Sequence, residues 1–354
     1  MQEEIISPGQ KIREMLRVRG ILQKEFAMRM GLTEKHVSKL INGEVQLTVD
    51  VAVRLETVLG IPATVWNAME ARYREQLLRS GEEHPSEADV ELAQCIPYAE
   101  MVKLGWVPAA RNVKDKIAAL RSFFEVVDLS LLEKWQVSGA ACRELSVRDK
   151  EDLVLMAWMQ AAKKMIRNSE TAPFNVKDFE LLIPDLRGWT NEKPAVFLPL
   201  LEEALAERGI LLVILPRIRG LFLQSASFPS GNRAVIAMTA KKMDDNEFWI
   251  RFMQELGHVY LGHVWQEGGT TEQDERDAGV WARNALLPRA DLDAFKEAGS
   301  FTEKSVIGFA RHYDVAPGVL VGRLQYEGVL GGGTLGRLKA KYDLTKIAKE
   351  PDWL

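Results

Sequence analysis

The residues best suited to chemistry lie in the run 254–258, QELGH, inside the apolar stretch 244–263. With histidine in place of Gln254, this run would read H-E-x-x-H. In that pattern two imidazoles four residues apart on a helix bind zinc, and the glutamate between them, here Glu255, is the general base. An amide has no imidazole nitrogen, and glutamine is seldom a zinc ligand. The spacing is therefore that of a zinc-binding helix that keeps His258 and lacks its first ligand.

The stretch 244–263 predicts one buried helix. Asp244 or Asp245 can cap its first turn. Its apolar residues fall on more than one side of the helix and are Phe248, Ile250, Phe252, Leu256, Val259 and Tyr260. His263 lies five residues after His258, so we expect it to point away from the His258 face. A second helix is predicted from Glu275 to the Leu286-Leu287-Pro288 run, since proline ends a helix.

Together the two helices resemble the ImmA/IrrE family of metallopeptidase-like domains. The matching residues are Asp245, Phe248, Trp249, Phe252, Glu255, Leu256, Gly257 and His258, followed by Glu275, Ala278, Ala282, Leu286, Leu287 and Pro288. The resemblance implies that Glu275 stands at the third zinc-ligand position. Two residues depart from the family pattern: Gln254 replaces the first ligand, and Gly279 replaces an Asn or Asp able to hold a ligating imidazole.

These departures predict a vestigial site. His258 and Glu275 are then remnants of metal ligands, Gln254 marks the lost ligand, and Glu255 is a vestigial general base that bonds to His258 or Arg251. We expect no cofactor, with zinc as the alternative. Trp249 and Trp281 are expected to be core residues rather than binding platforms.

Residues 9–70 predict four or five short helices. Gly20 and Gly60 are helix stops, Gly31 makes a tight turn, and Thr33 caps a third helix that runs to Asn42. This is the layout of a helix-turn-helix whose recognition helix spans residues 33–42.

The details resemble the XRE-type helix-turn-helix of HigA-like antitoxins. The matching runs are 22–27 (LQKEFA), 31–38 (GLTEKHVS) and 41–43 (ING). Val37, Leu40 and Ile41 are predicted to face the core, which leaves the polar side chains free to meet DNA. The candidate DNA-binding residues are Gln23, Thr33, Glu34, Lys35, His36, Ser38 and Lys39. Gln23 stands at a helix N-terminus and can donate to a phosphate. The plainer alternative is that Lys35, Lys39 and Arg19 only solvate a face.

Composition bounds these interpretations. The chain has 354 residues, 47% hydrophobic and 27% charged, which is enough for two or three domains. A net charge of −4 excludes a global basic signature, so DNA contact must come from a local patch. Cys95 and Cys142 are too few for a disulfide framework and are predicted to be core residues. With no signal peptide and no long apolar run, we expect a cytoplasmic protein without a membrane partner.

The remaining sequence predicts further helices and a small sheet. A polar break at 80–86 suggests a linker. Clear helices are expected at 113–124 and 147–168. Three apolar runs, at 210–215, 221–225 and 234–239, are expected to form a small antiparallel sheet under the 245–263 helix.

The predicted fold class is mainly α with a small β-sheet, α+β. An N-terminal helix-turn-helix domain is followed by a C-terminal zincin-like, metallopeptidase-like domain. The expected domains are residues 1–79 for DNA binding, 80–124 for a linker and connecting helices, and 125–354 for the ImmA/IrrE-like domain.

The favoured interpretation is a DNA-binding antitoxin. As a homodimer it would bind a double-stranded operator and repress its own operon, while the C-terminal domain neutralises a cognate toxin. The toxin is implied by the resemblance alone. Two alternatives stay open: an active zinc endopeptidase that cleaves a repressor or toxin, and a one-component, ligand-sensing transcription regulator. Gln254 argues against the first, and a neighbouring toxin gene would exclude the second.

Overall fold

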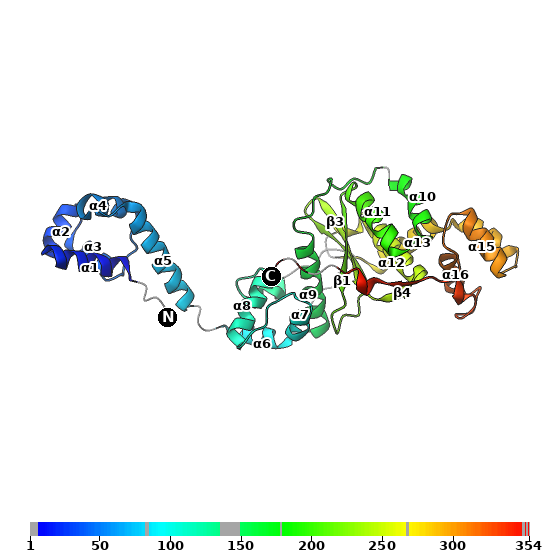
Figure 1. The fold of residues 1–354 in the computed structure, drawn as a ribbon, viewed down its shortest axis with the longest axis horizontal. Helices are drawn as coiled ribbons and strands as arrows, with labels where there is room; N and C mark the ends of the chain where they lie inside the picture. Colours follow the sequence, from blue (N-terminus) through cyan, green and yellow to red (C-terminus); the bar gives the residue numbers. More distant parts are fainter. Residues whose placement is uncertain are drawn as a thin grey trace. The chain divides into compact units, whose positions relative to one another are not determined.

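The computed structural model describes residues 6–81, 85–134, 149–177, 179–266 and 269–348, together with Pro351 and Trp353. The chain forms two compact units, Met1–Pro85 and Ser86–Leu354. The helices are labelled along the chain in Figure 1. No helix in the described ranges is long and apolar enough to cross a membrane.

The first unit is a bundle of five helices, as the sequence predicts. They are α1 (Pro8–Arg19), α2 (Gln23–Met30), α3 (Glu34–Ile41), α4 (Val49–Leu59) and α5 (Ala63–Gly81). Side chains of Ser7, Thr33 and Thr48 cap α1, α3 and α4. A core that includes Phe26 and Trp66 is fully buried, so this unit has its own hydrophobic centre.

A three-stranded mixed sheet lies at the centre of the second unit. Its strand order is β1 (Ile210–Pro216), β3 (Arg233–Ala240), β2 (Ser225–Ser230). β2 pairs antiparallel with β3, but β1 pairs parallel with it, so the prediction of an antiparallel sheet is wrong for β1. A tight turn joins β2 to β3, whereas residues 217–224 between β1 and β2 are long enough to carry the chain to the far edge.

The second strand also differs in position from the predicted run 221–225. β2 begins at Ser225 and includes Pro229. Proline cannot donate to a strand ladder and is tolerated on an edge strand, and β2 is at an edge of this sheet.

Helices cover both faces of this sheet, because its residues alternate between two cores (Figure 1). Leu211 and Val213 share one core with α9 (Lys150–Met165), while Leu212 and Ile214 share the other with the central helix α12 (Asp245–Tyr260). A strand buried on both faces reads as a continuous apolar run rather than an alternating one, as 210–215 does.

The layer around α9 contains the segment that the sequence assigned to connecting helices. It comprises α6 (Glu87–Cys95), α7 (Tyr98–Lys103), α8 (Val113–Phe124) and the 3-10 helix η1 (Leu129–Lys134). Leu120 of α8 and Trp158 of α9 are buried in the same core, so residues 86–124 are an integral part of the second unit. The predicted bounds of α8 are correct. The predicted 147–168 helix is shorter, and residues 147–148 lie outside the described ranges.

The opposite layer carries the candidate site. It contains α10 (Phe179–Trp189), α11 (Pro194–Ala206), α12, the 3-10 helix η2 (His263–Trp265) and α13 (Glu272–Leu286). The chain then forms α14 (Arg289–Glu297), α15 (Glu303–His312) and α16 (Pro317–Tyr326), with a core of their own. A short β4 (Lys242–Asp244) pairs antiparallel with β5 (Lys341–Asp343) just before α12 begins. The 3-10 helices η3 (Gly336–Leu338) and η4 (Leu344–Lys346) flank β5.

Candidate functional site

The first candidate site is the outer face of α3. Val37, Leu40 and Ile41 are buried, as predicted, and fix the helix against the rest of the unit. Thr33 caps the helix, because its Oγ1 accepts a hydrogen bond from the backbone N–H of His36 at 3.1 Å. The opposite face therefore has a defined orientation.

The polar residues predicted to meet DNA lie on that free face. Glu34, Lys35 and Lys39 are exposed, and His36 and Ser38 are half-buried. No acidic side chain in the described ranges forms an ion pair with Lys35 or Lys39. These cations are therefore available to a phosphate or a base edge.

The start of α2, the helix that precedes α3, offers a second feature suited to phosphate. No side chain caps α2, and Gln23 at its first position is exposed. The first backbone N–H groups of a helix carry partial positive charge, which favours an anion at this end. The turn between α2 and α3 contains Gly31 in the left-handed conformation, as predicted.

Arg19, in contrast, is part of the framework. Its Nη2 donates to the carbonyl of Leu59 at 2.7 Å, at the end of α4. Arg13 donates to the amide oxygen of Asn42 at 2.9 Å, just after α3. These two arginines hold α1 against α4 and the end of α3, so Arg19 does more than solvate a face.

The second candidate site begins at the start of α12. Asp244 caps the helix, because its Oδ1 accepts the N–H of Glu247 at 2.8 Å. Asp245, the other predicted cap, is buried beside α16, and its Oδ1 accepts the N–H of Asn246. Burial raises the pKa of Asp245 to about 6.

The three residues predicted to form a vestigial zinc pattern lie together between α12 and α13. The Nε2 of Gln254 donates to Oε2 of Glu275 at 3.0 Å, and the Nε2 of His258 lies 3.4 Å from Oε1 of Glu275. Gly257 allows this approach, since a Cβ there would lie 3.0 Å from the carbonyl of Ala278. Burial alone would raise the pKa of Glu275, but the hydrogen bonds from His258 and Gln254 lower it below its usual value.

His263 also belongs to this cluster, contrary to the prediction. Its Nδ1 lies 3.2 Å from Nδ1 of His258, and its Nε2 lies 3.4 Å from Oδ1 of Asp274. The α-helix ends at Tyr260, and Gly262, at φ 80°, turns the chain back. Burial is the main cause that lowers the pKa of His263. The glycine was the feature of the sequence that could have revealed this contact.

This arrangement does not fit a catalytic zinc ion. Such a site needs three protein ligands and an open position for water. Here the amide of Gln254 and the hydroxyl of Thr270 both donate to Glu275, while His258 contacts Glu275 and His263. The ranges that the structure describes contain no group of three His, Cys, Asp or Glu side chains able to hold a metal ion. We therefore derive no metal-dependent step.

Glu255 is buried in a different surrounding from the one expected. Its Oε2 has no hydrogen-bond partner among the described residues. Burial raises the pKa of this carboxyl, while the nearby Ser227 and Ser225 hydroxyls of β2 oppose the shift. The predicted bond to His258 or Arg251 does not form, because the Nη2 of Arg251 donates to Glu247 at 3.3 Å instead.

Two tryptophans and two cysteines were also predicted to be core residues. Trp249 is fully buried, as predicted, whereas Trp281 is half-buried and lines a surface groove. Cys95 is exposed rather than in the core, because it is the last residue of α6 on that helix's outer side. Cys142 lies outside the described residues.

Comparison with known proteins identifies the type of domain in the first unit. The model of a helix-turn-helix family matches residues 12–66. No curated protein matches the chain. Among solved structures, the chain is similar to a Nostoc punctiforme PCC 73102 protein described as a candidate antidote protein of a plasmid maintenance system. The two share 30% identity over 22% of this chain and 87% of that one, with a TM-score of 0.21. The family match shows that residues 12–66 of the first unit form a helix-turn-helix domain, the kind that binds DNA.

Proposed function

We propose that this chain is a DNA-binding antitoxin. The first unit binds a two-fold symmetric operator as a homodimer and represses its own operon. The observation that carries the proposal is the outward polar face of α3, where Lys35 and Lys39 form no ion pair with any acidic residue that the structure describes. In a helix-turn-helix dimer each recognition helix occupies the major groove of one half-site, and the half-sites lie about one helical turn apart.

The DNA-binding part is tested with the full chain and the duplex upstream of its own coding sequence. Lys39→Ala should lower operator affinity, and the slope of log affinity against log salt should fall by about one unit if a phosphate contact is lost. Lys114→Ala, an exposed lysine on α8, removes the same charge from the second unit and should leave binding unchanged. Equal effects of the two substitutions would contradict a specific role for α3.

We further propose that the second unit neutralises a protein toxin and is a metallopeptidase-like domain that has lost its catalytic zinc. Two observations support this division. The second unit has hydrophobic cores of its own. It is larger than would be needed only to dimerise the first unit. In the α12–α13 cluster, the amide of Gln254 donates to Glu275 at the position where a zinc site needs a ligand.

Growth rescue separates the roles of the units. Residues 86–354, co-expressed with the protein encoded by the neighbouring gene, should rescue growth without repressing the promoter. Rescue by residues 1–85, with none from the second unit, would overturn the assignment.

Metal analysis tests the loss of zinc. Protein purified without added metal should carry well below one zinc per chain, and Gln254→His should raise zinc affinity by restoring an imidazole. Glu255→Gln should leave growth rescue and operator binding unchanged. Stoichiometric zinc in the unaltered protein, with loss of function in Glu255→Gln, would support the peptidase alternative instead.

A further inference from the structure

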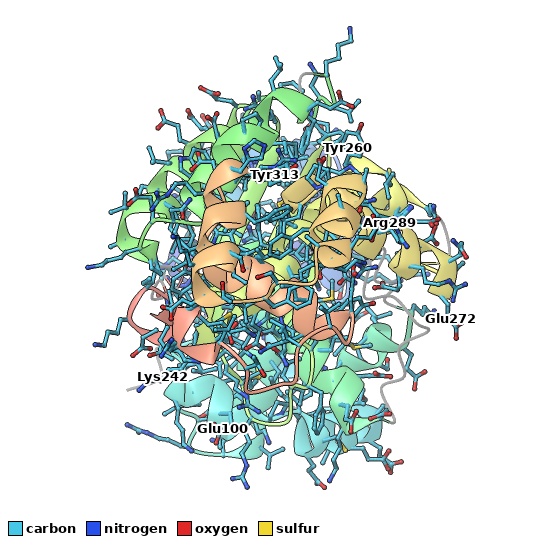
Figure 2. All side chains as sticks on the ribbon, turned by 90° about the vertical axis from the view of Figure 1, so that its right-hand side faces the viewer. Glu100, Lys242, Tyr260, Glu272, Arg289 and Tyr313 are labelled. Carbon is cyan, nitrogen blue, oxygen red and sulfur yellow. The ribbon has the colours of Figure 1, made fainter. Side chains whose placement is uncertain are left out.

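A groove of about 560 Å³ runs along the outer side of the second unit, between α10, the end of α12 and α13. Its floor is aromatic: the rings of Tyr260 and Trp281 stack with centroids 5.1 Å apart and an interplanar angle of 26°. Tyr260 is labelled in Figure 2, where it lies on the same side of the unit as the green and yellow helices.

The walls of this groove are apolar and incompletely covered. Ile183 of α10 and Ala285 of α13 line it. So do Leu261 and Val280, which are 40% and 49% exposed although both are large aliphatic residues. Removing apolar surface from water is favourable, so a partner that covers these side chains gains affinity.

The charged side chains that line the groove are carboxylates, although the nearby Arg187 guanidinium donates to the carbonyl of the lining residue Ala285 at 2.7 Å. Glu180 and Asp277 line it, and no lysine or arginine does. Glu180 accepts only a long bond from the Tyr260 hydroxyl, at 3.4 Å, and Asp277 accepts the amide of Gln273 at 2.8 Å. Neither carboxylate has an ion-pair partner within the described ranges. His263 supplies no free cation, because it is bonded within the buried cluster.

We propose that this groove is the docking site for a basic segment of a protein partner, one large apolar or aromatic side chain entering the groove with lysines or arginines beside it. The proposal rests on the proposed function, and its partner is the toxin. Charge complementarity selects the occupant. A nucleic acid would bring phosphates against Glu180 and Asp277. A second copy docking through the same face would bring two acidic rims together.

The test uses the full chain in three forms. Glu180→Lys with Asp277→Lys reverses the rim charge, and Val280→Asp places a carboxylate in the apolar wall. Glu170→Lys with Glu297→Lys is the matched control, since it changes the net charge equally at two exposed glutamates outside the groove. Thermal unfolding of each variant confirms that the second unit is folded.

Two probes are measured by titration: the purified protein encoded by the neighbouring gene, and a capped peptide of lysine and leucine in helical register with one tryptophan. Affinity of the unaltered chain should fall as salt rises, because the rim contacts are exposed charges. The charge-reversed and Val280→Asp variants should each lose at least about tenfold in affinity, the equivalent of about 1.4 kcal/mol, while the control keeps it.

The outcomes separate this proposal from the proposed function. One outcome is that the unaltered chain does not bind the protein encoded by the neighbouring gene and yet binds the basic peptide through the groove. That result would contradict the antitoxin function and support the groove as a site for basic segments. If the chain binds and neutralises the toxin equally well in all forms, the function stands and the groove is overturned. A groove variant that converts a dimer to a monomer in solution would also overturn it, because the occupant would then be a second copy.

Discussion

The outer face of α3 and the cluster between α12 and α13 contain similar side chains in opposite surroundings. On α3, Lys35 and Lys39 are exposed and pair with no acidic side chain in the described part of the chain. In the cluster, His258 and His263 are buried and contact each other, and Glu275 accepts from Gln254. Residue type alone therefore does not identify a functional site. The free face can bind a ligand without losing an internal contact, whereas a ligand of the cluster would have to displace existing partners.

The largest expected effect is on the pH dependence of stability and comes from a buried acid, a feature absent from the exposed face of α3. The pKa of Asp245 is raised by burial to about 6 from 3.8. Its native carboxyl holds the proton more tightly than the unfolded chain does, so the stability it contributes is present below about pH 4 and is lost as pH rises through about 6. Asp245→Asn should remove about 3 kcal/mol of this pH dependence.

Urea unfolding of the full chain at a series of pH values measures that difference for the second unit. Asp185→Asn, at an exposed aspartate of α10, is the matched control. If the free energy of unfolding varied with pH in the same way for Asp245→Asn and the unaltered protein, burial of Asp245 would not be raising its pKa.

The next largest effect concerns the exposed lysines of α3. Replacing both Lys35 and Lys39 by alanine should weaken operator binding about thirtyfold, because each of the two lost contacts is worth roughly 1 kcal/mol. The free energy of unfolding should change by less than about 0.5 kcal/mol, as expected for surface residues. A large loss of stability, with binding per folded molecule unchanged, would mean that these lysines are structural.

A smaller effect tests whether Gln254 joins α12 to α13. Gln254→Ala removes a donor to the Glu275 carboxylate and should lower the free energy of unfolding by about 1 kcal/mol. Gln94→Ala, at an exposed position of α6, is the same substitution and should cost less than about 0.5 kcal/mol. Equal costs at the two sites would remove the structural role of the Gln254–Glu275 bond.

Much of the first unit follows from local sequence, because short-range interactions determine it. Thr33 and Thr48 cap helices, and glycines at the helix ends adopt the left-handed conformation. The same holds for α8, which begins after its cap Asn112 and ends at Phe124 as predicted. Spacing places Gln254 and His258 on one helical face, whereas the approach of Glu275 was expected only from the family resemblance.

Features that depend on long-range packing are the ones the sequence leaves undetermined. The parallel pairing of β1 with β3 depends on the path of residues 217–224 across the sheet. His263 returns to His258 because a single glycine, Gly262, reverses the chain. The exposure of Cys95 depends on which face of α6 packs against α8. Helical periodicity does not specify these relations.

The most direct test of the account is a footprint of the operator with separate units. Residues 1–85 have their own core and contain every residue assigned to DNA contact. This fragment should protect the same two half-sites as the full chain, and residues 86–354 should protect none. Protection by the full chain or by the second unit, with none from residues 1–85, would contradict the assignment of DNA recognition to the free face of α3.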